Sequence, residues 1–419
     1  MNLKKANAPW LDSVPADWPS SRIRNMARLS PGYSDGFPTP DERCTVVPME
    51  LLSAAGTIDT TLLQAFEDIP GGLTLFETGD VLFAKITPCM ENGKGAFVKS
   101  LPTRYAFGST EFHVLRPNHN IDATFLYYYT FNPIFRAYAA ENMSGAAGQK
   151  RVSSRFLKDT RLFCPPLQEQ ERIAAYLDAS CAAIDAAVAA KRRQIDLLDN
   201  FQRVTITEVV TRGLNESVLL KDSGVLELGQ IPAHWRRTKL RYEISVRSGD
   251  FASDKLEEDG EYPVIGGNGE MGRAAGYNID GEIVVVGRVG AYCGNAHYVK
   301  GRAWISDNAL IVESNHDKRF LTHLIRVLDF NSTAKKTAQP LVTGTQIKNT
   351  YVGMPQVAEQ EKIVAFIEKM SALFASLRET LSSQIEALTA YRKSLIHECV
   401  TGQRRITAMD VKSAEKIRS

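Results

Sequence analysis

The segment QKRVSSRFLKDTRLFCPPLQEQERIAAYLD (residues 149–178) recurs as QPLVTGTQIKNTYVGMPQVAEQEKIVAFIE (residues 339–368). The two copies are offset by 190 residues throughout, without a gap, so that Val152 aligns with Val342 and Pro165 with Pro355. The same register continues as far as the segments 208–211 and 398–401. Because an internal repeat fixes the architecture of a chain, this sequence predicts a protein built from two copies of one plan.

Shorter matches extend the repeat upstream of these segments. LDSVPADW (11–18) parallels LGQIPAHW (228–235), and GDVLFAKI (79–86) parallels GEIVVVGR (281–288). The chain therefore alternates a variable half with a shared block, twice, and ends in a short charged tail. We expect a first domain over 1–166, a first shared block over 167–213, a second domain over 214–356, a second shared block over 357–403 and a tail over 404–419.

Each shared block is predicted to be one long helix. It starts after a proline and is rich in Ala, Leu, Glu, Gln, Arg and Lys, which are good helix formers. Apolar residues recur in a heptad, and the expected seam consists of Leu177, Ile184 and Leu198 in the first block and Ile367, Phe374, Leu381, Leu388 and Leu395 in the second. About 40 residues at ~1.5 Å per residue make a rod roughly 60 Å long. Such a helix cannot bury its apolar stripe alone, and the simplest partner is the other long helix of the same chain.

The variable halves have a different sequence pattern. Short apolar runs such as 81–84, 283–286 and 309–312 are separated by clusters of Gly, Pro, Asn and Asp, which is typical of strands and turns. Helices are expected near 124–140 and 318–330. The fold class is therefore α+β, with one mixed α/β domain in each half and two long helices between them.

Composition limits the remaining possibilities. The chain has 419 residues, 44% of them hydrophobic, which is enough for two or three packed domains and too apolar for a disordered chain. A net charge of +2 does not decide for or against nucleic acid. The six cysteines lack the spacing of a zinc site, and neither a signal peptide nor an apolar run of roughly 20 residues is evident. We expect a soluble, intracellular protein without a metal.

Three patterns that suggest catalysis are incomplete. Gly267-Asn-Gly269-Glu-Met-Gly272 fits a dinucleotide-binding loop, but the residues after it favour a strand where a helix would be needed. Asn132-Pro-Ile-Phe resembles the catalytic turn of adenine methyltransferases but lacks the second proline. His113 and His119 are expected to be a surface pair, because no third metal ligand accompanies them. We predict a protein without catalytic activity of its own.

Polar and cationic residues in the glycine-rich loops are the candidates for DNA binding. Arg and Lys can bond the guanine O6 and N7 atoms, and Asn can bond the adenine N6 and N7 atoms. The candidates are Lys85, Thr87, Asn92, Lys94, Gln149, Lys150 and Arg151 in the first half and Asn268, Arg273, Arg288, Tyr292 and Asn295 in the second. Lys85 precedes Asn92 by seven residues, and Arg288 precedes Asn295 by the same number.

Taken together, these residues resemble the specificity subunits of type I restriction-modification systems over nearly the whole chain. The resemblance rests on Val14-Pro-x-x-Trp18 and Ile231-Pro-x-x-Trp235 before the two halves, and on Glu-Gln-x-x-Ile at the start of each shared block. The segments 79–86 and 400–402 also match. One departure is Thr211-Arg-Gly, which stands where the second copy has Thr401-Gly-Gln, so the first helix is expected to end differently.

The resemblance implies a role and a set of partners. Each half would be a target-recognition domain that reads one part of a bipartite double-stranded DNA site, asymmetric because the halves differ over 30–78. The helices would pack as an antiparallel coiled-coil spacer and dock two methyltransferase subunits, which endonuclease subunits join. S-adenosylmethionine, ATP and magnesium would belong to the partners, leaving this chain without a cofactor. Two alternatives stay open: an enzyme in its own right, and a coiled-coil scaffold without DNA readout.

Overall fold

The computed structural model describes residues 2–32, 36–146, 148–225, 229–252, 256–333 and 340–418. Leu228 and Gln339, which begin two of the repeated segments, lie outside these ranges, as do Ser419 and residues 33–35 of the divergent stretch 30–78. The chain forms two compact units: Met1–Arg192 with Ser383–Ser419, and Arg193–Ser382. Each unit therefore contains part of both shared blocks.

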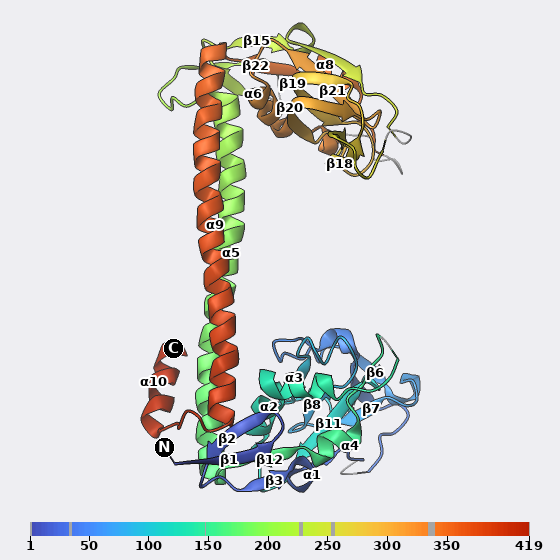
Figure 1. The fold of residues 1–419 in the computed structure, drawn as a ribbon, viewed down its shortest axis with the longest axis vertical. Helices are drawn as coiled ribbons and strands as arrows, with labels where there is room; N and C mark the ends of the chain where they lie inside the picture. Colours follow the sequence, from blue (N-terminus) through green and yellow to red (C-terminus); the bar gives the residue numbers. More distant parts are fainter. Residues whose placement is uncertain are drawn as a thin grey trace. The chain divides into compact units, whose positions relative to one another are not determined.

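The first unit is a mixed α/β domain (Figure 1). Its four-stranded sheets have the orders β6-β5-β10-β7 and β4-β11-β8-β9, and two-stranded pairs join β1 with β2 and β12 with β3. The strands are β1 Leu3–Ala8, β2 Leu11–Pro15, β3 Ser20–Arg22, β4 Ala27–Leu29, β5 Arg43–Val47, β6 Leu63–Ala65, β7 Thr74–Phe76, β8 Val81–Ala84, β9 Gly95–Phe97, β10 Ala106–Gly108, β11 Phe112–Pro117 and β12 Arg161–Phe163. The helices are α1 Ile23–Met26, α2 Ala123–Phe131, α3 Pro133–Glu141 and α4 Ser154–Asp159, with 3-10 turns at Met49–Leu51 and Phe66–Asp68.

The core of this unit lies between the β8–β11 sheet and helices α2 and α3. Phe83 of β8, Leu115 of β11 and Phe125 of α2 are fully buried in one cluster. The expected single helix near 124–140 is two helices, because Pro133 starts a new one and the Asn132 side chain accepts the backbone N–H of Ile134 as its N-cap.

The second unit is built around one six-stranded sheet of order β16-β21-β19-β20-β17-β18 (Figure 1). Its strands are β13 Leu220–Asp222, β14 Gln230–Pro232, β15 Arg236–Lys239, β16 Ile244–Ser248, β17 Tyr262–Gly266, β18 Gly269–Ala274, β19 Ile279–Gly287, β20 Ala296–Ile305, β21 Ala309–Ser314 and β22 Tyr351–Met354. A 3-10 turn spans Leu240–Tyr242, and the short helices are α6 Lys318–Val327, α7 Phe330–Thr333 and α8 Gly344–Asn349. Phe320 and Leu324 of α6 pack on Val284 of β19, so the helix covers this sheet as α2 covers its own.

The shared blocks form the helices α5, Leu167–Arg212, and α9, Val357–Val400. In the first unit the Arg392 Nε atom lies 3.0 Å from the Asp185 carboxylate. In the second unit the rings of Phe201 and Phe374 meet edge to face with their centroids 5.9 Å apart. In the first unit Lys191 also donates to the Gln384 side chain at 2.5 Å, and in the second unit Gln202 donates to the Ser371 hydroxyl at 3.2 Å. Within each unit the contact positions therefore rise on one helix as they fall on the other, so the helices are antiparallel there. The α+β fold class with two long paired helices is confirmed.

The seam residues of the two long helices are buried to different extents. Leu177, Ile184, Ile367, Phe374 and Leu395 are buried, whereas Leu198, Leu381 and Leu388 are half-buried. Eighteen consecutive residues of α5 are apolar enough to cross a membrane by length and composition alone. Leu177, Cys181 and Ile184 of that helix are buried in the core of the first unit, and 39% of the apolar stretch is buried inside the structure.

One glutamine at the start of each long helix ties that helix to its domain. The Gln170 side chain accepts the Asp122 backbone N–H at 2.9 Å and donates to the Pro165 carbonyl at 2.9 Å. Gln360 repeats this arrangement with the Asp317 N–H at 3.0 Å and the Pro355 carbonyl at 2.9 Å. Since Asp122 and Asp317 are the N-caps of α2 and α6, the Glu-Gln motif fixes an equivalent helix in each domain.

Each long helix also ends against a tryptophan of the Pro-x-x-Trp motif. A Cβ on Gly402 would lie 3.0 Å from the Trp18 ring, and one on Gly213 would lie 3.4 Å from the Trp235 ring. Both glycines have a positive φ, near +72° and +78°, which favours glycine at a helix C-terminus. With the offset of 190 residues, Gly213 corresponds to position 403, which is one residue after Gly402. The helix α5 therefore ends differently from α9, as the sequence departure predicts.

The charged tail folds as a helix. Residues Ala408–Arg418 form α10, and Ala414 is buried in the core of the first unit together with Ile406. The sequence alone did not predict a helix here.

Candidate nucleic-acid interface

Lys85 directly follows β8 and is held by its backbone between two loops of the first unit. Its N–H donates to the Glu111 carbonyl at 2.9 Å, and its carbonyl accepts the Val152 N–H at 2.9 Å. These bonds bring the predicted residues at 85–87 next to those at 149–151. Segments far apart in the sequence thus meet at one place.

Arg288 has the equivalent position in the second unit. Its N–H donates to the Asn308 carbonyl at 2.9 Å, and its carbonyl accepts the Val342 N–H at 2.9 Å. Val152 and Val342 are the aligned valines of the repeat. Lys85 and Arg288 therefore occupy the same backbone frame, although the residues around them differ.

Sequence reasoning missed Glu111 and Asn308, the residues that hold this frame from the other side. Both follow a serine by two positions, and the serine hydroxyl accepts their backbone N–H, from Glu111 to Ser109 at 3.2 Å and from Asn308 to Ser306 at 3.3 Å. The parallel between STEFHVL (109–115) and SDNALIV (306–312) is the signal that would have found them.

Several predicted side chains in the first unit have intramolecular partners. Lys85 Nζ donates to the Thr110 carbonyl at 2.6 Å, and Thr87 Oγ1 donates to the Lys150 carbonyl at 3.0 Å. Arg151 forms a bidentate pair with Glu111, the shortest bond being 2.7 Å, and this hydrogen bonding lowers the pKa of the Glu111 carboxyl. These contacts set the shape of the loop cluster.

The remaining first-half candidates differ in exposure. Asn92, Gln149 and Lys150 are exposed and free to meet a ligand. Lys94 is half-buried, and its Nζ donates to the Met49 carbonyl at 2.8 Å, so it supports the turn that carries Asn92.

In the second unit, four predicted residues gather at one end of the sheet. Asn268 stands at the exposed tip of the β17–β18 hairpin, and the neighbouring Gly267 lies so close to Gly287 that a Cβ would be 3.3 Å from its Cα. Gly287 precedes Arg288, and its N–H donates to the Asn295 carbonyl at 2.8 Å. Tyr292, 52% exposed, accepts the Asn295 N–H at its own carbonyl. The Arg288 guanidinium reaches the Ser248 hydroxyl at 3.2 Å.

Arg273 belongs to a different part of the hairpin. It stands near the far end of β18, and its guanidinium donates to the Gly260 carbonyl at 2.9 Å and the Glu261 carbonyl at 2.7 Å. These bonds hold the Arg273 guanidinium against the segment that precedes β17. β18 continues through Gly272, so the glycine-rich motif forms a hairpin instead of opening a helix.

The prediction of a surface pair for His113 and His119 is wrong. His113 is buried in β11, its Nε2–H donates to the Val152 carbonyl at 2.8 Å, and burial lowers its pKa. His119 is exposed on the turn after this strand. A histidine on the inner face of a strand packs as a core residue once its ring nitrogen has a partner.

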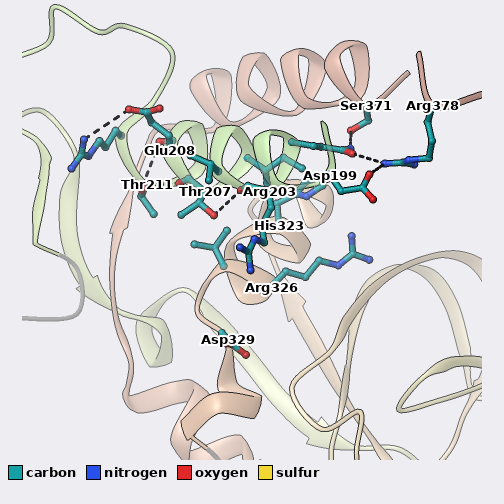
Figure 2. A pocket seen from close by; sticks show the side chains of 15 residues that line it. Asp199, Arg203, Thr207, Glu208, Thr211, His323, Arg326, Asp329, Ser371 and Arg378 are labelled. Carbon is teal, nitrogen blue, oxygen red and sulfur yellow. Dashed lines mark hydrogen bonds and ion pairs between the residues drawn. The ribbon is translucent and has the colours of Figure 1, made fainter. Parts of the chain in front are cut away.

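A cavity of about 1260 Å³ lies elsewhere in the second unit, beside α5, α6 and α9 (Figure 2). The Thr207 and Thr211 hydroxyls donate to carbonyls one turn earlier, at 2.9 and 2.7 Å, and Arg378 pairs with Asp199. His323 and Arg326 of α6 also line the cavity, and burial lowers the pKa of His323 to about 4. Several of the polar side chains in the lining are thus already paired, and the cavity is a groove beside helices.

The sequence matches a family model described as the type I restriction modification DNA specificity domain, over residues 68–195 and 243–387. The EcoAI specificity subunit of Escherichia coli is 34% identical over 163 residues, which are 38% of this chain and 27% of that subunit. The match thus spans about a quarter of that relative's length. The MjaVIII specificity subunit of Methanocaldococcus jannaschii is 20% identical over 442 residues, covering 94% of each chain.

Solved structures share the fold. A chain from a structure of the type I R-M system superposes with a TM-score of 0.75 at 18% identity, covering 93% of this chain and 99% of the other. The HsdS subunit from Thermoanaerobacter tengcongensis gives a TM-score of 0.57 at 17% identity, covering 93% and 98%.

Proposed function

From the premise that this chain belongs to the family of type I restriction-modification DNA specificity domains, we propose that it is the DNA-recognition subunit of such a complex. It binds double-stranded DNA with a bipartite, asymmetric site. One half of the site is read by the loops around Lys85 and the other by the loops around Arg288. The chain itself carries out no chemistry.

The observation that carries this proposal is the common backbone frame of the two loop clusters. The same hydrogen bonds hold Lys85 and Arg288, while the exposed side chains around them differ: Asn92, Gln149 and Lys150 in one unit, and Asn268, Tyr292 and Asn295 in the other. A constant frame with variable polar side chains suits direct readout of different bases.

The proposed partners are two methyltransferase subunits and, for cleavage, endonuclease subunits. The long helices supply the docking surface and set the spacing between the half-sites. The partner subunits then bind S-adenosylmethionine, ATP and magnesium. The complex acts in the cytoplasm and does not associate with a membrane.

The alternative is a coiled-coil scaffold without DNA readout. The test combines the purified chain with its methyltransferase subunit and maps methylation across genomic DNA. We expect methylation at one bipartite motif and none by the chain alone. Methylation that is independent of this chain, or assembly without sequence preference, would reject the role.

A further inference from the structure

Each unit carries its exposed candidate readers on one turn that follows a central strand. The turn of residues 86–94 comes after β8 and carries Asn92. The turn of residues 289–296 comes after β19 and carries Tyr292 and Asn295. We call these the first and the second reading turn. The contacts that hold the backbone of each turn determine where its exposed side chains lie.

The first reading turn is held by Arg136 of α3, which is only 6% exposed. Its Nη1 donates to the Met90 carbonyl at 2.8 Å, and its Nη2 donates to the Lys94 carbonyl at 3.3 Å. Its Nε donates to the Thr130 carbonyl at 2.9 Å. The two carbonyls on the turn come before and after Asn92 in the sequence. One buried side chain therefore fixes the turn on both sides of its exposed asparagine.

The surroundings of this guanidinium fit an arginine closely. The Arg136 Cζ atom lies 4.7 Å from the centroid of the Phe83 ring and 4.7 Å from that of the Phe131 ring. A Cβ on Gly95 would come within 3.1 Å of Nη2, so the glycine leaves room for it. Among the described residues, no carboxylate pairs with Arg136. Burial of such a cation costs more than burial of an apolar side chain, so its bonds to the turn are what distinguish it from a core residue.

The second reading turn is held by Asn331 of α7, which has the equivalent place in its unit. Arg136 follows Asp122, the N-cap of α2, by 14 residues. Asn331 follows Asp317, the N-cap of α6, by the same number. The Asn331 Nδ2 donates to the Ala291 carbonyl at 2.9 Å, directly before the exposed part of the turn. Two residues of different type thus bind the reading turns from one position of the repeat.

Arg326 of α6 holds the other side of the second reading turn. Its Nε donates to the Ala296 carbonyl at 2.8 Å, and it is one of the residues that line the cavity in Figure 2. Arg326 follows its N-cap aspartate by nine residues, as Phe131 does in the first unit. Phe131 contributes one of the rings that lie on Arg136. The two units therefore use different side chains at equivalent positions to hold a turn before and after its exposed residues.

We propose that Arg136 and Asn331 are positioning residues for base readout, each of which fixes the reading turn of its own unit, with Arg326 assisting Asn331. This inference rests on the proposed function, because it takes the two turns as readers of DNA. The positioning residues act through backbone carbonyls and need not touch the DNA. A change at Arg136 should therefore alter recognition of one half-site, and a change at Asn331 should alter recognition of the other.

The test measures methylation by the full chain assembled with its methyltransferase subunit, on a DNA library randomised over both half-sites. Asn331→Ala should lower base discrimination in the second half-site by roughly tenfold, the value of one well-placed base contact, and leave the first half-site unchanged. Ser332→Ala is the matched control, because the Ser332 hydroxyl donates to the Asp329 carbonyl at 2.8 Å and not to the turn. Asn331 and Ser332 are both exposed, so thermal melting should find both variants folded.

Arg136→Lys tests the first unit, because a lysine keeps the charge but lacks the planar fork that bonds two carbonyls. It should lower discrimination by roughly tenfold at the positions that Asn92→Ala affects. The double variant should lose no more there than Asn92→Ala alone, since both changes act through one turn. Arg116→Lys is the control: the Arg116 guanidinium pairs with Asp80 at 2.8 Å, so this variant should lower the stability of the same unit and keep its preferred bases.

Added guanidinium separates a local role from a general loss of stability. Arg136→Ala leaves a buried space between the Phe83 and Phe131 rings that matches a guanidinium ion. Millimolar guanidinium chloride should restore part of the lost discrimination in the first half-site, whereas the same concentration of sodium chloride should not. A variant that is merely unstable would lose further activity in guanidinium, because this ion favours the unfolded chain.

The outcomes separate the two levels of inference. A parent complex without any sequence preference would reject the proposed function itself. A parent complex whose preferences are unchanged by Asn331→Ala and by a folded Arg136→Lys would leave that function standing and overturn the positioning role. The role is also overturned if either substitution relaxes both half-sites, or if Arg116→Lys relaxes the first half-site to the same extent. Should Arg136→Lys not fold, the result for Asn331→Ala decides.

Discussion

The Val342 backbone N–H donates to the Arg288 carbonyl at 2.9 Å, which joins the segment that follows β19 to the segment that precedes α8. Because the bond uses only backbone atoms, the Arg288 side chain can change without loss of the frame. The equivalent bond of Val152 with Lys85 gives the first domain the same freedom. Loops built in this way can change the bases they read while their fold is kept.

Arg288→Ala should relax specificity at one position of one half-site. A guanidinium bonding guanine bidentately contributes about 1–3 kcal/mol of discrimination, whereas a phosphate contact would weaken binding to all sequences alike. Lys85→Ala should act on the other half-site. The measurement is methylation by the assembled complex on a DNA library randomised over both half-sites.

Arg273→Ala is the matched control for these variants, because the Arg273 guanidinium is bonded to the Gly260 and Glu261 carbonyls. It should lower the stability of the hairpin and leave the preferred bases unchanged. If Arg288→Ala and Lys85→Ala both lower activity uniformly, these residues are not readers. If one substitution alters both half-sites, the division of labour between the units is wrong.

Gln360→Ala should destabilise the second unit and Gln170→Ala the first. Each glutamine is almost fully buried, and its loss leaves a buried N–H and a buried carbonyl without a partner. An unsatisfied buried group costs about 1–3 kcal/mol. Denaturant unfolding followed by tryptophan fluorescence would measure this, with the exposed Gln168→Ala as control. Equal stability of Gln168→Ala and Gln170→Ala would contradict the bracing role.

Leu388→Asp should disturb the helix pair, and Leu395→Asp should disturb it more, since Leu395 is 1% exposed and Leu388 is half-buried. An unpaired carboxylate in an apolar seam costs several kcal/mol, roughly 2–5. Thermal melting and assembly with the methyltransferase would record both effects, with Glu386→Gln at an exposed position as control. A Leu388→Asp protein that melts, assembles and binds DNA as the parent does would refute the antiparallel spacer.

The second unit should lose stability as the pH falls from about 6.5 to about 4. Burial lowers the pKa of His323 to about 4, from an ordinary value of 6.5. Between these values the unfolded chain binds a proton that the folded chain does not, so the free energy of unfolding rises with pH across this window and is constant above it. The effect is roughly 1–3 kcal/mol. His323→Gln should flatten the pH dependence of denaturant midpoints relative to the parent; an unchanged slope would exclude His323 as its source.

The repeat, the two long helices and the α+β domains were predictable because they depend on periodicity and composition within short windows. The burial of His113 was not predictable, since it depends on a hydrogen bond to the carbonyl of Val152, which lies in another segment. The same holds for Glu111, which meets Lys85 only after β8 and β11 have paired. Residue type identified Arg273 as a candidate reader, but its carbonyl partners are visible only in three dimensions. Local sequence patterns thus predict the helices and strands, whereas the partners of individual side chains depend on contacts between distant segments.

The discontinuous first unit has a consequence for the order in which the protein matures on the ribosome. Residues Arg193–Ser382 form the second unit as one continuous stretch, whereas Ser383–Ser419 belong with Met1–Arg192. Leu395, Ile396, Cys399 and Val400 fill the core of that first unit, and they are synthesised after the whole of the second unit. The first unit is therefore completed only after the second. Until these residues have left the ribosome, the apolar interior of the first unit is incomplete, and the nascent chain is prone to aggregation in this interval.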